Sequence, residues 1–79
     1  MEGDLQIAVG ASLRARRLAA GMSQEAFAEL IGVHRTYMGG VERGERNLTL
    51  KSLERIAERI GVDPRVLLDP APEGHRAGP

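Results

Sequence analysis

The chain has 79 residues with eleven basic and eleven acidic side chains, so its formal net charge is zero, and it contains no cysteine. This length allows one small domain, and the lack of cysteine excludes disulfides and thiolate zinc sites. No apolar run is long enough to span a membrane, and the acidic first residues are unlike a secretory signal, so we expect a cytoplasmic protein. Because so small a domain is marginally stable alone, an oligomer is favoured.

Three short helices are predicted in the first half of the chain. Apolar residues at helical spacing predict the first over residues 7–20, after a flexible start at residues 1–6. The second begins after Ser23, a favourable N-cap, and ends before Gly32. The third covers residues 35–43.

Two further helices are predicted before the composition changes. The fourth helix follows Thr49, another favourable N-cap, and carries apolar residues along one face. An aspartate–proline pair at 63–64 predicts a fifth helix through Leu68. Residues 69–79 are rich in proline and glycine, and we expect them to be disordered. The chain is therefore predicted to be all-α, with one domain at residues 7–68.

Residues 24–41 fit a helix-turn-helix. Two helices that cross steeply need a small residue where they come closest, and Ala28 occupies that place. The turn needs a residue that tolerates positive φ, and Gly32 provides it. The inner faces need apolar residues one turn apart, and the chain has Phe27 and Ile31 on the first helix and Met38 and Val41 on the second.

Over residues 9–68 the chain resembles the Cro and phage-repressor (Xre-type) helix-turn-helix family. The residues that carry this likeness are Leu13, Arg14, Arg17, residues 21–25, Ala28, Gly32, Val33, residues 42–44, Leu53, Ile56, Ala57, Gly61 and Val62. Within the family, the chain is most similar to the controller proteins of restriction-modification systems. That closer likeness lies in residues 34–37, 40–43 and 46–49.

The resemblance implies a compact five-helix, lambda-repressor-like DNA-binding domain with the helix-turn-helix in its second and third helices. It implies a homodimer on a near-palindromic operator, so the expected partners are double-stranded DNA and a second copy. Controllers of this kind regulate their own gene and an endonuclease gene, activating at low occupancy and repressing at high occupancy. We therefore expect an autoregulatory transcriptional regulator at the nucleoid. The alternatives are a stand-alone phage-type repressor and an antitoxin-like regulator.

Two features depart from the family pattern. Arg16 stands where the family usually has an apolar residue. Gly39 and Gly40 both lie inside the predicted recognition helix, where each glycine costs about 0.5–1 kcal/mol relative to alanine. Gly40 fits the controller pattern and permits a close approach of another backbone, whereas Gly39 has no explanation from the sequence.

The start of the recognition helix is predicted to read bases. In this motif the first residues of the second helix face the base edges, and here they are Arg35, Thr36 and Tyr37. Arg35 presents a fork that suits O6 and N7 of guanine, and Thr36 offers a methyl group to thymine. The alternatives are a solvated arginine at position 35 and a partly buried core ring for Tyr37.

Phosphate contacts are predicted on both sides of the recognition helix. Gln24 lies at a helix N-terminus, where the partial positive charge favours an anion. The other candidates are His34, Arg43, Arg46 and Asn47, which would fix the register on the DNA. The alternatives are that His34 only starts its helix and that Arg46 is a solvated loop charge.

Two further sets of residues are assigned structural roles. In the family, the residues that match Arg17 and Glu42 pair with each other, and here too we expect an ion pair. Three consecutive apolar residues in the fifth helix cover more than one helical face, which predicts a surplus face for a second copy. We therefore predict a dimer interface of Val62, Val66 and Leu67, against the alternative of an ordinary exposed leucine.

No enzyme is expected from this sequence. No nucleophile lies beside a base, and the two histidines, His34 and His75, are isolated in the sequence. The sequence likewise predicts no metal site, no cofactor and no small-molecule ligand. Residues 69–79 lack a large apolar anchor, which argues against a toxin-binding segment.

Overall fold

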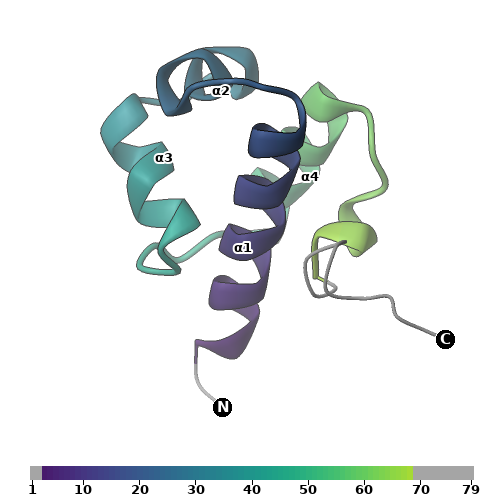
Figure 1. Cartoon of the computed structure of the whole chain (residues 1–79). Helices are drawn as coiled ribbons and strands as arrows, with labels where there is room; N and C mark the ends of the chain where they lie inside the picture. Colours follow the sequence, from purple (N-terminus) through teal and green to yellow (C-terminus); the bar gives the residue numbers. More distant parts are fainter. Residues whose placement is uncertain (1–2, 69–79) are drawn as a thin grey trace, which may run out of the picture.

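The computed structural model describes residues 3–68, which contain helices and no strand. The elements are α1 (Asp4–Ala19), α2 (Gln24–Ile31), α3 (Arg35–Glu42), α4 (Leu50–Ile60) and the 3-10 helix η1 (Pro64–Leu68), as Figure 1 shows. The prediction of an all-α fold is confirmed. The expected fifth α-helix is wrong in kind, because this segment forms a five-residue 3-10 helix.

Local capping explains where the short helices begin and end. The Ser23 hydroxyl oxygen accepts the backbone N–H of Ala26 at 3.0 Å, which caps α2. The Thr49 hydroxyl does the same for Ser52 at 3.0 Å and caps α4. Gly32 ends α2 with a φ of 78°, the left-handed conformation that the sequence predicts for the turn.

The beginning of the chain differs from the expectation. Residues 4–6 were predicted to be flexible, but α1 begins at Asp4 and includes them. An acidic residue in the first turn stabilises the helix N-terminus, and the side chain of Gln6 is hydrogen-bonded to a distant loop. Residues 1–2 and the predicted disordered tail, residues 69–79, lie outside the described residues.

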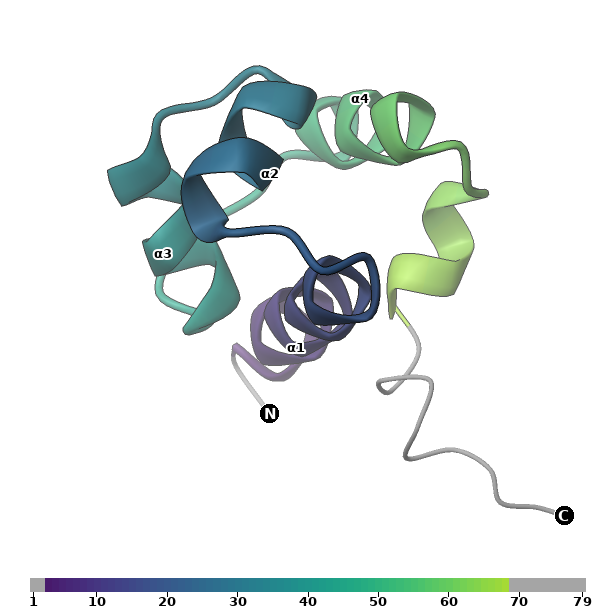
Figure 2. The same cartoon turned by 45° about the horizontal axis from the view of Figure 1, so that its top comes forward.

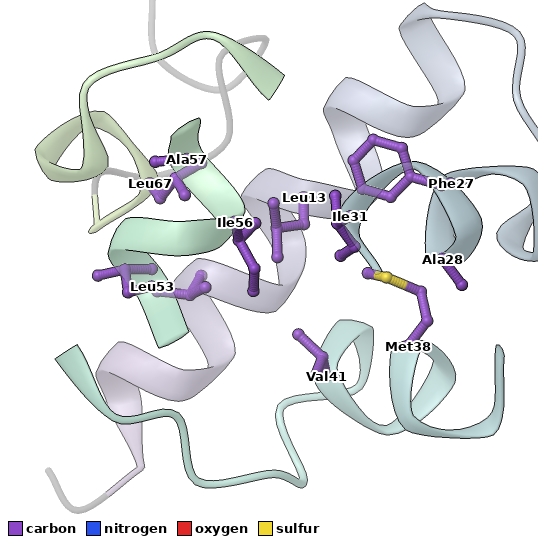
Figure 3. Packing of buried hydrophobic residues seen from close by; sticks show 11 residues of the cluster. Leu13, Phe27, Ala28, Ile31, Met38, Val41, Leu53, Ile56, Ala57 and Leu67 are labelled. Carbon is purple, nitrogen blue, oxygen red and sulfur yellow. The ribbon is translucent and has the colours of Figure 1, made fainter. Parts of the chain in front are cut away.

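The core lies between α1 and the other helices. Figure 2 shows α3 and η1 on either side of α1, and the helix contacts agree, because α1 packs against both. The fully buried Leu13, Met38 and Leu67 come from three different elements. The rest of the buried apolar cluster, most of it drawn in Figure 3, consists of Val9, Phe27, Ala28, Ile31, Val41, Leu53, Ile56 and Ala57. The four inner-face residues of the predicted helix-turn-helix and Ala28 all belong to this cluster.

Gly10 brings α1 into backbone contact with the end of α3. A Cβ atom on Gly10 would lie 2.2 Å from the carbonyl oxygen of Val41 and 2.8 Å from that of Glu42. No side chain fits in that space, so only glycine permits this crossing.

In the described part of the chain no helix is long and apolar enough to cross a bilayer.

Candidate nucleic-acid interface

The N-terminal end of α3 presents its polar side chains to solvent. His34 is the N-cap residue of α3 but its side chain makes no capping hydrogen bond, and Arg35 and Thr36 follow it. All three are exposed. An exposed helix N-terminus with an arginine and a threonine fits a major groove, which admits one α-helix. The structure thus leaves Arg35 and Thr36 accessible for the base contacts that the sequence predicts.

Tyr37 is held differently from these neighbours. Its ring is half-buried and packs against the apolar core. The guanidinium carbon of Arg46 lies 5.2 Å from the ring centroid, within the range of a cation–π contact. In the absence of DNA, Tyr37 is therefore a partly buried ring, as the alternative interpretation expected. A contact between Tyr37 and a base stays a prediction.

The two adjacent glycines of α3 leave room for polar side chains that cross it. A Cβ atom on Gly40 would lie 3.0 Å from Cγ of Arg46, so the stem of Arg46 occupies that space. A Cβ atom on Gly39 would lie 3.2 Å from Nη1 of Arg43 and 3.6 Å from Oε1 of Gln24. Side chains from α2 and from the end of α3 therefore cover Gly39, but the nearest of them is the flexible end of Arg43, so the structure does not require glycine at this position.

A buried ion pair joins α1 to the end of α3, as the resemblance implied. Arg17 Nε donates to Glu42 Oε2 at 2.7 Å and Arg17 Nη2 donates to Oε1 at 3.0 Å. Arg17 Nη1 also donates to the carbonyl oxygen of Met22 at 3.0 Å. This bidentate geometry is the strong form of an arginine–carboxylate contact.

The protonation of Glu42 is set by its hydrogen bonds. Burial alone raises the pKa of Glu42, but hydrogen bonds from Arg17 and Gln24 outweigh it and hold the pKa below its ordinary value. The hydrogen bond to Glu42 raises the pKa of Arg17 in turn. Both groups are therefore charged at neutral pH.

Gln24 has a role that the sequence did not reveal. Its side-chain amide donates to Glu42 Oε1 at 3.0 Å, so it belongs to the ion-pair network. The predicted phosphate contact of the Gln24 side chain therefore competes with this bond. Of the first backbone N–H groups of α2, that of Ala26 is capped by Ser23, and those of Gln24 and Glu25 suit a phosphate, as at any helix N-terminus.

The loop between α3 and α4 carries the remaining predicted phosphate contacts. Arg43, Arg46 and Asn47 are all exposed. Arg43 Nε lies 3.1 Å from Glu45 Oε1 in an exposed ion pair of little strength. Gln6 Nε2 donates to the carbonyl oxygen of Arg46 at 2.7 Å. Sequence reasoning missed Gln6 because its partner is 40 residues away.

The predicted dimer interface needs a correction at Leu67. Leu67 is fully buried within its own chain, whereas Val62 and Val66 are half-buried. The prediction assumed α-helical rotation, but η1 is a 3-10 helix that packs against both α1 and α4. Leu67 therefore belongs to the monomer core.

A different apolar surface lies beside η1. Leu50 is 79% exposed and Leu5 is 62% exposed. These two side chains line one depression together with Leu48, Leu53 and Leu68. We call this surface, formed by the starts of α1 and α4 and the end of η1, the Leu50 face.

Among the described residues, no cluster of His, Cys, Asp or Glu is suited to a metal ion.

Comparison with known proteins identifies the family. The helix-turn-helix family model matches residues 13–67. Control protein C.BamHI of Bacillus amyloliquefaciens is 40% identical over 70 residues, which cover 87% of this chain and 86% of that protein. The restriction-modification controller protein C.AhdI from Aeromonas hydrophila superposes with a TM-score of 0.71 and 44% identity, covering 78% of this chain and 94% of that one.

A second solved controller was captured on DNA. The restriction-modification controller protein C.Esp1396I, a tetramer in complex with its natural 35 base-pair operator, superposes with a TM-score of 0.69 and 41% identity. The match covers 80% of this chain and 83% of that one. The chain therefore belongs to the helix-turn-helix family and is a relative of restriction-modification controller proteins.

Proposed function

We propose that this chain is a sequence-specific DNA-binding regulator that controls its own restriction-modification operon as a homodimer on a near-palindromic operator. The observation that carries the proposal is the exposed N-terminal end of α3, with Arg35 and Thr36, on a helix-turn-helix that a buried ion pair fixes. The likeness to a controller solved on its operator supports it. The protein acts in the cytoplasm at the nucleoid and is not an enzyme.

α3 is the element that contacts the bases. Its eight residues span about 12 Å, which is enough for three or four base pairs in the major groove. Arg35 donates to O6 and N7 of a guanine, and the Thr36 methyl group contacts a thymine. Tyr37 contacts the DNA only when its ring leaves the cation–π contact with Arg46.

Phosphate contacts fix the register of α3. The exposed side chains of Arg43, Arg46 and Asn47 follow it, and the start of α2 lies beside it. His34 adds a contact from the N-cap of α3. Because the net charge of the chain is zero, the electrostatic affinity of one protomer is modest and falls with salt.

A second copy covers the Leu50 face. A leucine that is 79% exposed beside one that is 62% exposed is a costly surface for a domain of this size. Leu68 at the end of η1 belongs to this surface, whereas Val62 lines another depression with Met22 and Ile60. Interface contacts from Val62 and Val66 stay predictions. Pairing places two recognition helices about 34 Å apart, one turn of DNA, and so doubles the contacts that select the site.

A gel-shift titration on the DNA upstream of the gene tests this function, with excess unrelated DNA as competitor. We expect the wild-type protein to withstand the competitor and the Arg35→Ala variant to lose the complex. Arg59→Ala is the matched control, because Arg59 is an exposed arginine near the end of α4, outside the helix-turn-helix and the Leu50 face. A second, slower complex at higher concentration is expected if two dimers share the operator. Equal loss of the wild-type complex to unrelated DNA would refute the proposal.

A further inference from the structure

The first turn of α1 holds the loop that follows α3. Gln6 Nε2 donates to the carbonyl oxygen of Arg46 at 2.7 Å and to Oδ1 of Asn47 at 2.9 Å. One side-chain amide therefore fastens two successive residues that the proposed function places at the DNA backbone.

Packing fixes the same loop one residue further along α1. A Cβ atom on Gly44 would lie 3.0 Å from Cα of Ile7, and the φ of Gly44 is 76°. Only glycine combines this conformation with so close an approach. The loop therefore touches α1 at Ile7 through Gly44 and at Gln6 through Arg46 and Asn47.

The hydrogen bonds of Gln6 lie at the surface. Arg46 and Asn47 are exposed and Gln6 is half-buried. Each bond replaces one to water, so its net contribution to the stability of the domain is small. The larger effect is conformational, because the two bonds restrict the loop to one arrangement.

The hydrogen bond from Gln6 decides which end of the Asn47 amide can contact the DNA. An asparagine amide has an acceptor oxygen and a donor NH₂ group, and Gln6 occupies the oxygen. The donor end is the one that a phosphate oxygen needs. The bond from Gln6 thus leaves the NH₂ group of Asn47 available as a donor.

We propose that Gln6 is a positioning residue for operator binding, which holds Arg46 and Asn47 in the arrangement that meets the DNA backbone. This inference rests on the proposed function, because it requires the loop to contact DNA. A loop that is ordered before binding loses less conformational entropy in the complex, and the complex is tighter for it.

The test compares operator binding by Gln6→Ala and Gln6→Glu with the wild type. Neither variant can donate the two hydrogen bonds, so we expect binding about tenfold weaker, with a melting temperature close to that of the wild type. Leu18→Ala is the control on the same helix, because Leu18 is exposed near the other end of α1. It should bind as the wild type does.

A double-mutant cycle separates positioning from a general structural role. An Arg46→Ala, Asn47→Ala background lacks the side chains that Gln6 positions, although the backbone carbonyl of residue 46 is kept and can still accept from Gln6. Adding Gln6→Ala to this background should weaken DNA binding no further. A full tenfold loss in that background would overturn the inference, as would a Gln6→Ala variant that binds as tightly as the wild type. If the wild-type protein itself shows no specific binding, the proposed function fails first and this inference falls with it.

Discussion

Arg17 in α1 and Glu42 at the end of α3 form a buried ion pair with an N–O distance of 2.7 Å. Gln24 at the start of α2 donates to the same carboxylate, so three helices meet at Glu42. α2 and α3 make up the helix-turn-helix, and this network therefore fixes the motif against α1. The orientation of the recognition helix depends on it.

Removal of one partner of this pair should destabilise the domain strongly. Glu42→Ala leaves a buried arginine without its counter-charge, and we expect a loss of about 3–5 kcal/mol in the free energy of unfolding. Thermal denaturation followed by circular dichroism measures it. Glu45→Ala is the control, because its ion pair with Arg43 is exposed. A Glu42→Ala melting temperature within about a degree of the wild type would contradict the prediction.

Stability should fall in acid because of Glu42. Its pKa is lowered in the folded protein from an ordinary value of 4.5, so the ionised form stabilises the fold. This contribution is complete above pH 4.5 and is lost as the pH falls through the lowered pKa. Urea unfolding at a series of pH values should show the fall in the wild type and a flatter profile in Glu42→Gln.

Asp63 is a second acid with a lowered pKa, and it serves as the comparison for Glu42. Hydrogen bonds from the side chain and the backbone of Arg65 lower the pKa of Asp63 to about 2. Asp63 is exposed, so solvent screens this pair. Asp63→Asn should therefore leave most of the acid dependence in place. A Glu42→Gln profile as steep as that of the wild type would assign the dependence to other groups.

Two leucines should respond in opposite ways to the same substitution. Leu50→Glu places a charge on the exposed Leu50 face, so we expect a folded monomer that loses specific DNA binding. Leu67→Glu places the charge in the monomer core, so we expect an unfolded chain. Sedimentation and circular dichroism distinguish the two results. A Leu50→Glu protein that stays dimeric would remove the Leu50 face from the interface.

Gly10 should tolerate no side chain. A Cβ atom there would lie 2.2 Å from a backbone oxygen of α3, which can move only if the two helices separate. We expect Gly10→Ala to cost about 1–3 kcal/mol or more, although alanine is the better helix former. Ala11→Gly is the control, since Ala11 is exposed on the same helix and should lose only about 1 kcal/mol. A Gly10→Ala protein as stable as the wild type would show that α1 and α3 are not in backbone contact.

The helix-turn-helix could be predicted because its constraints are local. Ser23 and Gly32 act within a few residues of their own position, and the structure shows both in the expected role. Ala28 is buried, as its place in the motif requires. The Arg17–Glu42 pair spans 25 residues and was predicted only through the family resemblance. The candidate base-reading residues follow from the motif in the same way.

The sequence by itself determined the presence of the four α-helices, the N-caps Ser23 and Thr49, the turn and the DNA-binding motif, because helical spacing and capping depend on neighbouring residues. Only the tertiary structure decided which leucine is buried in the core and which is exposed, since Leu67 and Leu50 look alike in a one-dimensional pattern. It also decided what Gly10 and Gln6 do. Their partners come from other elements of the chain, and a contact of that kind exists only once the helices have packed.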